Sequence, residues 1–195
     1  SSATVIYPGR GIGLIRDGEL KEVTESDRTR KEYSGGLLRR IVSPDFEVTE
    51  LTYTQDPLGA VISSTVHDDL GTRTYSPEGV LQSAVSPNRT LFEYEATGVL
   101  KRILTPAHEE FLYVGGVLKV IRYLNADGNL RESLTDIVLD LSGNLRSGTF
   151  TSEDRSRWVI QNGILIELRK PDGVVFFYQP SGKVYEILNP LRRKN

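Results

Sequence analysis

A glycine followed two residues later by Leu, Val or Ile recurs along this chain of 195 residues. Fourteen of the 18 glycines are followed in this way, whereas the 52 Leu, Val and Ile residues of the chain would place about five there by chance. Ten of these glycines follow one another at intervals of 18, 23, 20, 19, 18, 12, 15, 20 and 19 residues: Gly18, Gly36, Gly59, Gly79, Gly98, Gly116, Gly128, Gly143, Gly163 and Gly182. A period of this kind indicates a repeat architecture built from small supersecondary units.

An aromatic residue keeps phase with the glycine period. It lies 13 residues after the aliphatic position in five units and 14 or 15 residues after it in two more, and the series is Tyr33, Tyr53, Tyr75, Tyr94, Tyr113, Trp158 and Tyr178. Turn-forming residues lie midway between the two markers, as in Ser86-Pro87-Asn88 and Lys170-Pro171-Asp172-Gly173. Proline presets φ for a turn, and Asp or Asn can bond the backbone just ahead. Each unit is therefore predicted to be strand, turn, strand, turn.

The segments between these turns have the composition of strands. They are runs of four to six residues rich in β-branched and aromatic types, such as Ile164–Leu168 and Val174–Tyr178, bounded by Gly, Pro, Asp and Asn. We assign the helix-like composition of residues 21–31 to a hairpin because it lies inside one unit. The prediction is an all-β protein of about ten tandem β-hairpin units of roughly 20 residues that form a curled or ribbon-like antiparallel sheet. A five-bladed β-propeller and a closed β-barrel are the alternatives.

Three parts follow from the extent of the repeat. We expect an N-terminal strand or lead-in over residues 1–16, a single β-hairpin repeat domain over 17–188 and a basic C-terminal tail over 189–195. The short intervals between Gly116 and Gly143 predict an irregular corner, or short hairpins at residues 125–128 and 140–143.

The composition excludes several classes of function. Lys and Arg number 24 against 26 Asp and Glu, so the net charge of −2 argues against a nucleic-acid partner. The absence of Cys excludes disulfides, thiolate metal sites and cysteine nucleophiles. No run of 18 apolar residues predicts a membrane-spanning helix. The glycine run Gly9–Gly13 lacks the third glycine and the βαβ context of a nucleotide site, and no cofactor is predicted.

The order of an aromatic, a few turn residues, Gly-x-Leu, a strand, Pro-Asp-x and a second strand resembles the RHS or YD repeat. The closest stretches are 75–88, 94–100 and 170–178, and the resemblance covers roughly residues 17–188. The Tyr-Asp dipeptide of that family does not appear. Members of the family include bacterial RHS and toxin-complex shell proteins and teneurins. The resemblance implies a non-enzymatic scaffold or binding module, such as a shell or adhesion segment of a secreted or cell-surface protein, and it transfers no catalytic residue.

Two histidines are the candidates for a metal site. His67 precedes Asp68 and Asp69, and His108 precedes Glu109 and Glu110, about two repeat periods further on. Imidazole and carboxylate ligands suit zinc, manganese or iron, so His67, Asp69, His108 and Glu110 are candidate ligands. The favoured interpretation is that both segments are solvated polar turns, so no metal is predicted. No motif of a known catalytic class is present, and we expect no enzyme activity.

The aromatic series is the candidate binding feature. If the units stack in register, the rings line one ladder that can stack on sugar rings or anchor a protein. The candidate ligand-binding residues are Tyr75, Tyr94, Tyr113, Trp158 and Tyr178. The favoured alternative is that each ring only packs beside the next repeat and closes its unit. The expected partners are a protein, or a second copy through open sheet edges, and a carbohydrate-binding or carbohydrate-active protein is the alternative function.

Overall fold

The protein consists of short antiparallel strands joined by tight turns. A computed structural model describes residues 2–7 and 11–190, which contain 19 strands and no helix. The chain divides into two compact units, Ser1–Gly98 and Val99–Asn195, called unit 1 and unit 2 below. The all-β prediction is confirmed, and so is the assignment of residues 21–31 to a hairpin, formed by the third and fourth strands.

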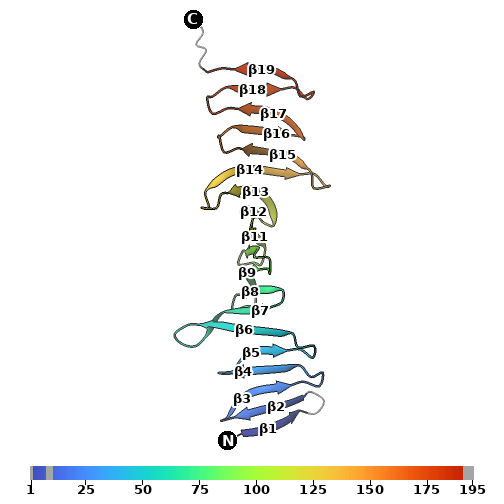
Figure 1. Cartoon of the computed structure of the whole chain (residues 1–195), viewed down its shortest axis with the longest axis vertical. Helices are drawn as coiled ribbons and strands as arrows, with labels where there is room; N and C mark the ends of the chain where they lie inside the picture. Colours follow the sequence, from blue (N-terminus) through green and yellow to red (C-terminus); the bar gives the residue numbers. More distant parts are fainter. Residues whose placement is uncertain (1, 8–10, 191–195) are drawn as a thin grey trace. The chain divides into compact units, whose positions relative to one another are not determined.

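Unit 1 is an antiparallel meander of ten strands (Figure 1). Each strand pairs only with its neighbours in the chain. The strands are β1 (Ser2–Tyr7), β2 (Gly11–Arg16), β3 (Glu19–Thr24), β4 (Arg30–Ser34), β5 (Leu37–Val42), β6 (Val48–Gln55), β7 (Val61–Asp68), β8 (Gly71–Tyr75), β9 (Leu81–Val85) and β10 (Leu91–Tyr94).

Unit 2 is a second antiparallel meander, of nine strands. They are β11 (Leu100–Leu104), β12 (Glu109–Val114), β13 (Val117–Leu124), β14 (Leu130–Leu139), β15 (Leu145–Thr151), β16 (Arg157–Gln161), β17 (Ile164–Arg169), β18 (Val175–Tyr178) and β19 (Val184–Leu188). In neither unit does a pairing between described strands close the sheet into a barrel or divide it into blades. The open sheet is therefore confirmed, and the propeller and barrel alternatives are wrong.

Two kinds of turn account for the glycine period. One is a two-residue turn with positive φ at both positions, as at Asn162 and Gly163, which is the type I′ hairpin turn. The other is a five-residue turn in which the first amide donates to the fifth carbonyl and the fourth amide donates to the first carbonyl. Its fourth residue is left-handed, and this residue is usually glycine, as at Gly79 and Gly143. The proline-containing turns have the same geometry, some with a glycine at the fourth position, such as Gly173, and others with a non-glycine residue, such as His108.

The aliphatic residue two positions after the glycine has a cross-strand partner on the preceding strand. This partner is the last residue of that strand or the one before it. Leu38 lies opposite Tyr33, Leu81 opposite Tyr75 and Leu118 opposite Tyr113. A register shift follows each of these pairs. The repeat in the sequence is thus the repeat of one hairpin closure. An aromatic ring faces the aliphatic side chain in some closures, and an aliphatic residue faces it in others, as Ile160 faces Leu165.

The short intervals between Gly116 and Gly143 have a simple geometric cause. Glycine occupies the turns at both ends of β13 and β14, so each interval spans one strand instead of two. The hairpins predicted at residues 125–128 and 140–143 are present as five-residue turns, 125–129 and 140–144. The alternative of an irregular corner is not needed.

The predicted part boundaries remain predictions. Strands β1 and β2 lie before residue 17, and β19 ends at Leu188. Residues 8–10 of the glycine run and residues 191–195 of the basic tail lie outside the described residues.

Candidate partner-binding face

One face of unit 2 carries a continuous row of apolar side chains. Residues directly opposite each other in antiparallel pairs point to the same face, so the register identifies the members of a face. Following the pairs from β11 to β19 gives one residue per strand, the apolar row: Ile103, Phe111, Ile121, Leu134, Phe150, Trp158, Leu168, Phe176 and Ile187. Every one of the nine strands thus contributes a large apolar side chain at the same level.

The opposite face of unit 2 is polar over strands β12 to β17 and apolar at the two ends. The parallel line of pairs on that face is Leu104, Glu110, Arg122, Ser133, Thr151, Arg157, Arg169, Val175 and Leu188. The Glu110 carboxylate is buried and accepts hydrogen bonds from Arg102 Nε at 2.7 Å and Arg122 Nη1 at 3.0 Å. A charge that is paired and hydrogen-bonded in this way can be buried at acceptable cost. The two faces therefore differ in polarity over the central strands β12 to β17, as in a sheet with one solvated side.

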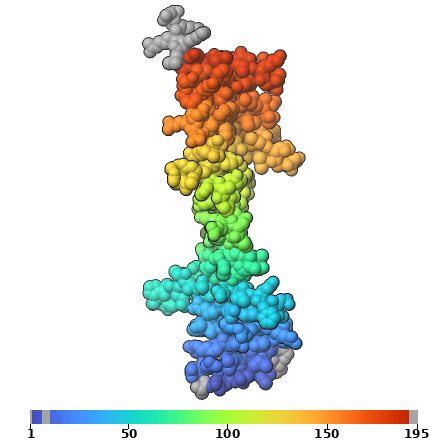
Figure 2. Space-filling view, viewed as in Figure 1, coloured from blue at the N-terminus to red at the C-terminus, as the bar shows by residue number. Residues whose placement is uncertain are grey.

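The apolar row is only partly shielded from water. No member of the row is among the buried residues of the chain, and Ile187 is 57% exposed. Figure 2 shows the strands of unit 2 at the surface with no other segment lying over the viewed face. Ile137 and Val175 are the buried hydrophobic residues among those described. A contiguous, exposed apolar surface of this kind is typical of an interaction site.

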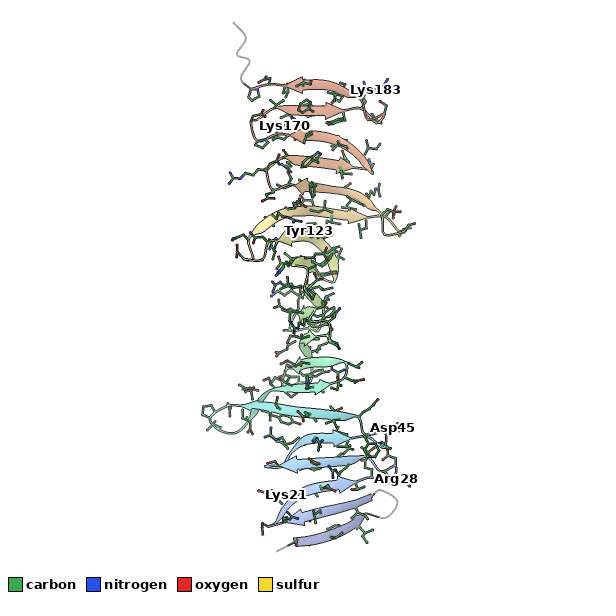
Figure 3. The ribbon with its side chains drawn as sticks, in the orientation of Figure 1. Lys21, Arg28, Asp45, Tyr123, Lys170 and Lys183 are labelled. Carbon is green, nitrogen blue, oxygen red and sulfur yellow. The ribbon has the colours of Figure 1, made fainter. Side chains whose placement is uncertain are left out.

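A shallow apolar hollow of about 430 Å³ lies on the row. It is lined by Phe150, Trp158, Ile160, Gly163 and Leu165. The Phe150 and Trp158 rings have centroids 5.3 Å apart at 50°, a tilted contact that is favourable for aromatic pairs. Phe176 lies on β18, two strands after Trp158. The Nζ atom of Lys170, in the turn before β18, lies 5.5 Å from the centre of the Phe176 ring. Figure 3 labels Lys170. A cation at this distance is attracted by the ring face.

A more polar hollow of about 500 Å³ shares Gly163 with the apolar one. Its other lining residues come from the turn 140–144, the start of β15 and the turn between β16 and β17: Asp140, Asn144, Leu145, Arg146 and Asn162. The Asp140 carboxylate accepts hydrogen bonds from the amides of Ser142 at 2.8 Å and Asn144 at 2.9 Å. Arg146 Nε donates to Asn162 Oδ1 at 3.4 Å.

The predicted aromatic residues share a face within each unit. In unit 1, Tyr53 and Tyr75 both lie opposite Ser64 on β7, and the register places Tyr33 and Tyr94 on that face as well. The guanidinium of Arg39 lies 5.2 Å from the centre of the Tyr53 ring. In unit 2, Tyr113, Trp158 and Tyr178 lie on the face of the apolar row. Their role in ligand binding stays a prediction.

The four candidate metal ligands divide between the two units. His67 lies on β7, where Nδ1 and Thr72 Oγ1 are 2.9 Å apart, and Asp69 lies in the turn that follows. His108 is the fourth residue of the turn 105–109, and Glu110 binds two arginines. Across residues 2–7 and 11–190, no group of three or more His, Asp or Glu side chains has the geometry of a metal site.

Sequence reasoning missed most of the apolar row. Leu134, Phe150 and Phe176 were not singled out because they lie in mid-strand and away from the glycine marker. Their signal is the alternation of apolar residues along each strand, as in Phe111 and Tyr113 of β12. The bulges shift this alternation, so it is visible in the register and weak in the sequence.

The two units carry opposite net charges. Unit 1 has 10 Lys and Arg against 15 Asp and Glu, a net charge of −5, whereas unit 2 has 14 against 11, a net charge of +3. The excess of +3 in unit 2 equals the three basic residues Arg192, Arg193 and Lys194, which lie outside the described residues, and residues 99–190 contain 11 Lys and Arg against 11 Asp and Glu.

Acidic side chains in the five-residue turns are tied to the backbone. The Ser152 hydroxyl, the Ser156 amide and the Ser156 hydroxyl all donate to Asp154 and lower the pKa of its carboxyl from 3.8. The amide of Thr29, followed by its hydroxyl, lowers the pKa of Asp27 in the same way. The Asn144 amide is the largest cause of the lowered pKa of Asp140.

These turns predict a loss of stability in acid. A carboxyl whose pKa is depressed in the folded state contributes stability above its unfolded pKa and loses it as the pH falls through the folded value. We expect the urea midpoint to stay level from neutral pH down to about pH 5. It should decrease once the pH is below 3.8, the ordinary pKa of an Asp carboxyl. Asp154→Asn should reduce that fall, because the amide does not titrate. A midpoint that rises on acidification below 3.8 would contradict the prediction.

The chain is similar to solved domains of the protein CPAP. With the TCP10 domain of Danio rerio CPAP, solved in complex with a peptide of Danio rerio STIL, it shares 16% identity over 97% of this chain and 99% of that chain, at a TM-score of 0.32. With the CPAP G-box domain it shares 17% identity over the same fractions of both chains, at a TM-score of 0.34. With the toxin complex TcdB2-TccC3-Cdc42 it shares 13% identity over 95% of this chain and 15% of that chain, at a TM-score of 0.17.

No family model matches the chain, and no curated protein matches it. The TM-scores are too low for the likenesses to assign a family or a partner. None of the described residues forms a helix long and apolar enough to cross a membrane.

Proposed function

We propose that this chain is a non-enzymatic β-repeat module that binds a protein partner through the apolar row of unit 2. The observation that carries the proposal is the row itself: nine large apolar side chains in register on one face, whereas the line on the other face is charged or hydroxyl-bearing from β12 to β17. The desolvation of such a row provides the driving force for association. Trp158, near the middle of the row, is the type of residue that dominates protein interfaces.

The finer part of the proposal is a YD-like shell or adhesion segment of a secreted or cell-surface protein. It is supported by the phase of the Gly-x-aliphatic and aromatic markers with the hairpin closures, as in the pair Tyr113 and Leu118. A second copy of the chain is one partner that such a segment can take through its sheet edges. Ile187 and Leu188 on β19 are 57% and 50% exposed and lie opposite Phe176 and Val175 on the two faces of the sheet, which leaves apolar area on both sides of that strand.

Selection of displayed peptides tests the binding face. We expect the intact chain to enrich peptides with apolar anchors, and Trp158→Ala to weaken the binding of the enriched peptides by about tenfold or more, as for an interface hot spot. Arg157→Ala is the matched control, because Arg157 is the exposed neighbour of Trp158 on β16 and points to the polar face. Arg157→Ala should change the affinity by less than about twofold.

Two measurements make the result decisive. Circular dichroism must show that both variants keep the β-sheet signal of the parent chain. Enrichment of peptides whose binding is equally sensitive to Trp158→Ala and Arg157→Ala would contradict the proposal, and so would the failure to enrich any peptide.

A glycan panel run in parallel tests the carbohydrate alternative, which requires a sugar that binds the parent chain and fails to bind Trp158→Ala.

A further inference from the structure

We infer that the apolar row of unit 2 packs face to face against the apolar row of a second copy of the chain. The two sheets then form a two-layer β-sandwich with the two rows between them. This inference rests on the proposed function and names the partner. It stands on three observations: the width of the apolar surface, the small number of buried hydrophobic residues among those described, and the neutral charge of residues 99–190.

A second line of side chains widens the apolar surface on the face of the row. Alternate residues of a strand point to the same face, so residues two positions along a strand from the row lie on it. Their cross-strand pairs give the side line: Tyr113, Leu118, Gly148, Ile160, Leu165, Tyr178 and Val184. A Cβ on Gly148 would lie 3.1 Å from Leu134 Cδ1 and 3.3 Å from Leu145 Cδ1, so two leucines fill its place. The apolar surface is therefore two side chains wide over most of unit 2.

Polar side chains limit this surface on the other side of the row. Across β12, β13 and β14, the next line of pairs on the same face is Glu109, Tyr123 and Glu132. An apolar centre with a polar border is the usual anatomy of a protein interface.

The surface reaches the size of a stable interface. Neighbouring strands lie about 4.8 Å apart and alternate residues about 6.8 Å apart, so the nine strands and two lines extend over roughly 40 Å by 14 Å. Two copies that cover this surface remove about 1,100 Å² of flat area from water, and more of accessible area because the side chains project from the sheet. Specific interfaces begin at about 1,200 Å² in total. The row and the side line are thus large enough to hold two copies together.

A second copy supplies the layer that the sheet of unit 2 lacks. Ile137 and Val175 are the buried hydrophobic residues among those described, which is too few for a core. A sheet gains a core when a second layer packs about 10 Å above it. Two copies have the same twist, so their sheets can pack closely. Residues 99–190 contain 11 Lys and Arg against 11 Asp and Glu, and their net charge therefore does not oppose the contact.

The centre of the row suits a two-fold contact. In such an interface both copies use the same patch, so the middle of the patch faces its own copy. Phe150 is the fifth of the nine members of the row, and the centroid of its ring lies 5.3 Å from that of Trp158. Both rings line the apolar hollow of about 430 Å³, which can receive an apolar side chain of the second copy. Contact between the two copies therefore buries Trp158.

Sedimentation and the fluorescence of Trp158, the single tryptophan of the chain, measure the contact independently. We expect the full chain to sediment as a dimer at about 50 µM, because interfaces of this area have micromolar or lower dissociation constants. Whenever the dimer dissociates, the emission of Trp158 should move to longer wavelength, since the indole becomes exposed to water. Pairing of sheet edges would leave the emission unchanged, because β16 lies three strands from β19.

Two neighbouring phenylalanines provide a matched pair of variants. Phe176 belongs to the row, whereas Phe177 points to the opposite face, and both side chains are half-buried. Phe176→Ala should weaken the dimer by about tenfold or more, and Phe177→Ala by less than about twofold. Circular dichroism must show that both variants keep the β-sheet signal of the parent chain. If Phe176→Ala loses this signal, Trp158→Ala and its control Arg157→Ala supply the same comparison by sedimentation.

The outcomes separate this inference from the function on which it rests. A monomer at about 50 µM, a dimer that dissociates without a change in Trp158 emission, or equal effects of the two variants of a pair overturns the inference. If the display selection still yields peptides that depend on Trp158, the proposed binding face stands and its partner is a different protein. If the selection also yields none, both fail. The selected peptides should dissociate the dimer, because both need the same row, and peptides that bind beside an intact dimer count against the inference.

Discussion

Replacing Gly71 with alanine is expected to destabilise unit 1 by about 3 kcal/mol or more. Gly71 begins β8 with φ of 113°, a conformation that residues with a side chain rarely adopt. A Cβ at this position would overlap the carbonyl oxygen of Val85 on the neighbouring strand β9. Both strands would have to separate, because a backbone atom cannot rotate away as a flexible side chain can. The loss is measured as a lower urea midpoint, followed by circular dichroism.

Gly79→Ala is the matched control for this prediction. Gly79 also has positive φ, at 82°, but no atom lies within 4 Å of where its Cβ would be. It occupies the fourth position of the turn 76–80, at the other end of β8. Alanine there meets only the cost of a left-handed backbone, about 1–2 kcal/mol. Equal losses for the two variants would show that the close approach of β8 and β9 is not what requires Gly71.

The sequence predicted the hairpins because their closures repeat chemically. Each closure needs a residue that tolerates positive φ, and it pairs the residue two positions later with a side chain at the end of the previous strand, as Leu118 pairs with Tyr113. These requirements are local and lie within a few residues, so the period shows in the sequence. The same local logic assigned residues 21–31 to a hairpin, although their composition suits a helix.

The mid-unit turns show where local logic ends. In the turns 43–47 and 105–109 the fourth residues, Phe46 and His108, are left-handed although they are not glycine, whereas the turn 170–174 has Gly173 at that position. Such residues adopt positive φ only when the hydrogen bonds of the surrounding strands hold them there, so the sequence does not predict the left-handed conformation. The proline and aspartate before them did predict a turn. That this turn is the same as the glycine-containing one became visible only from the hydrogen bonds.

The candidate site was predictable only in its aromatic part. The spacing placed Tyr113, Trp158 and Tyr178 on a ladder, and the register puts them on one face. The contact of Arg146 with Asn162 gave no such signal, because the two residues are 16 positions apart in the sequence. A single bulge moves every following side chain to the other face, and the register shifts in β13 and β14 therefore hide the apolar row from a count of alternating residues.

Ile137→Ala is expected to destabilise unit 2 by about 2–4 kcal/mol. Ile137 is 2% exposed and is the most buried hydrophobic residue described. It lies where the pairing of β14 with β15 shifts between Thr135 and Val138, next to Asp136 with φ of 55°. Removing its outer atoms leaves a cavity that two irregular strands cannot easily close. Trp158 on β16 belongs to the same unit, so its fluorescence in urea follows the loss.

Val138→Ala distinguishes burial from strand propensity. Val138 is the next residue of the same strand and is 47% exposed, so the substitution should cost less than about 1 kcal/mol. Most of the other large apolar side chains described in unit 2 remain half-exposed, so the sheet gains little from each of them. Its stability then depends unusually on the buried hydrophobic residues Ile137 and Val175. If Ile137→Ala and Val138→Ala lower the free energy of unfolding equally, the backbone hydrogen bonds alone hold the irregular part of β14. The buried Ile137 side chain would then contribute no more stability than the exposed Val138.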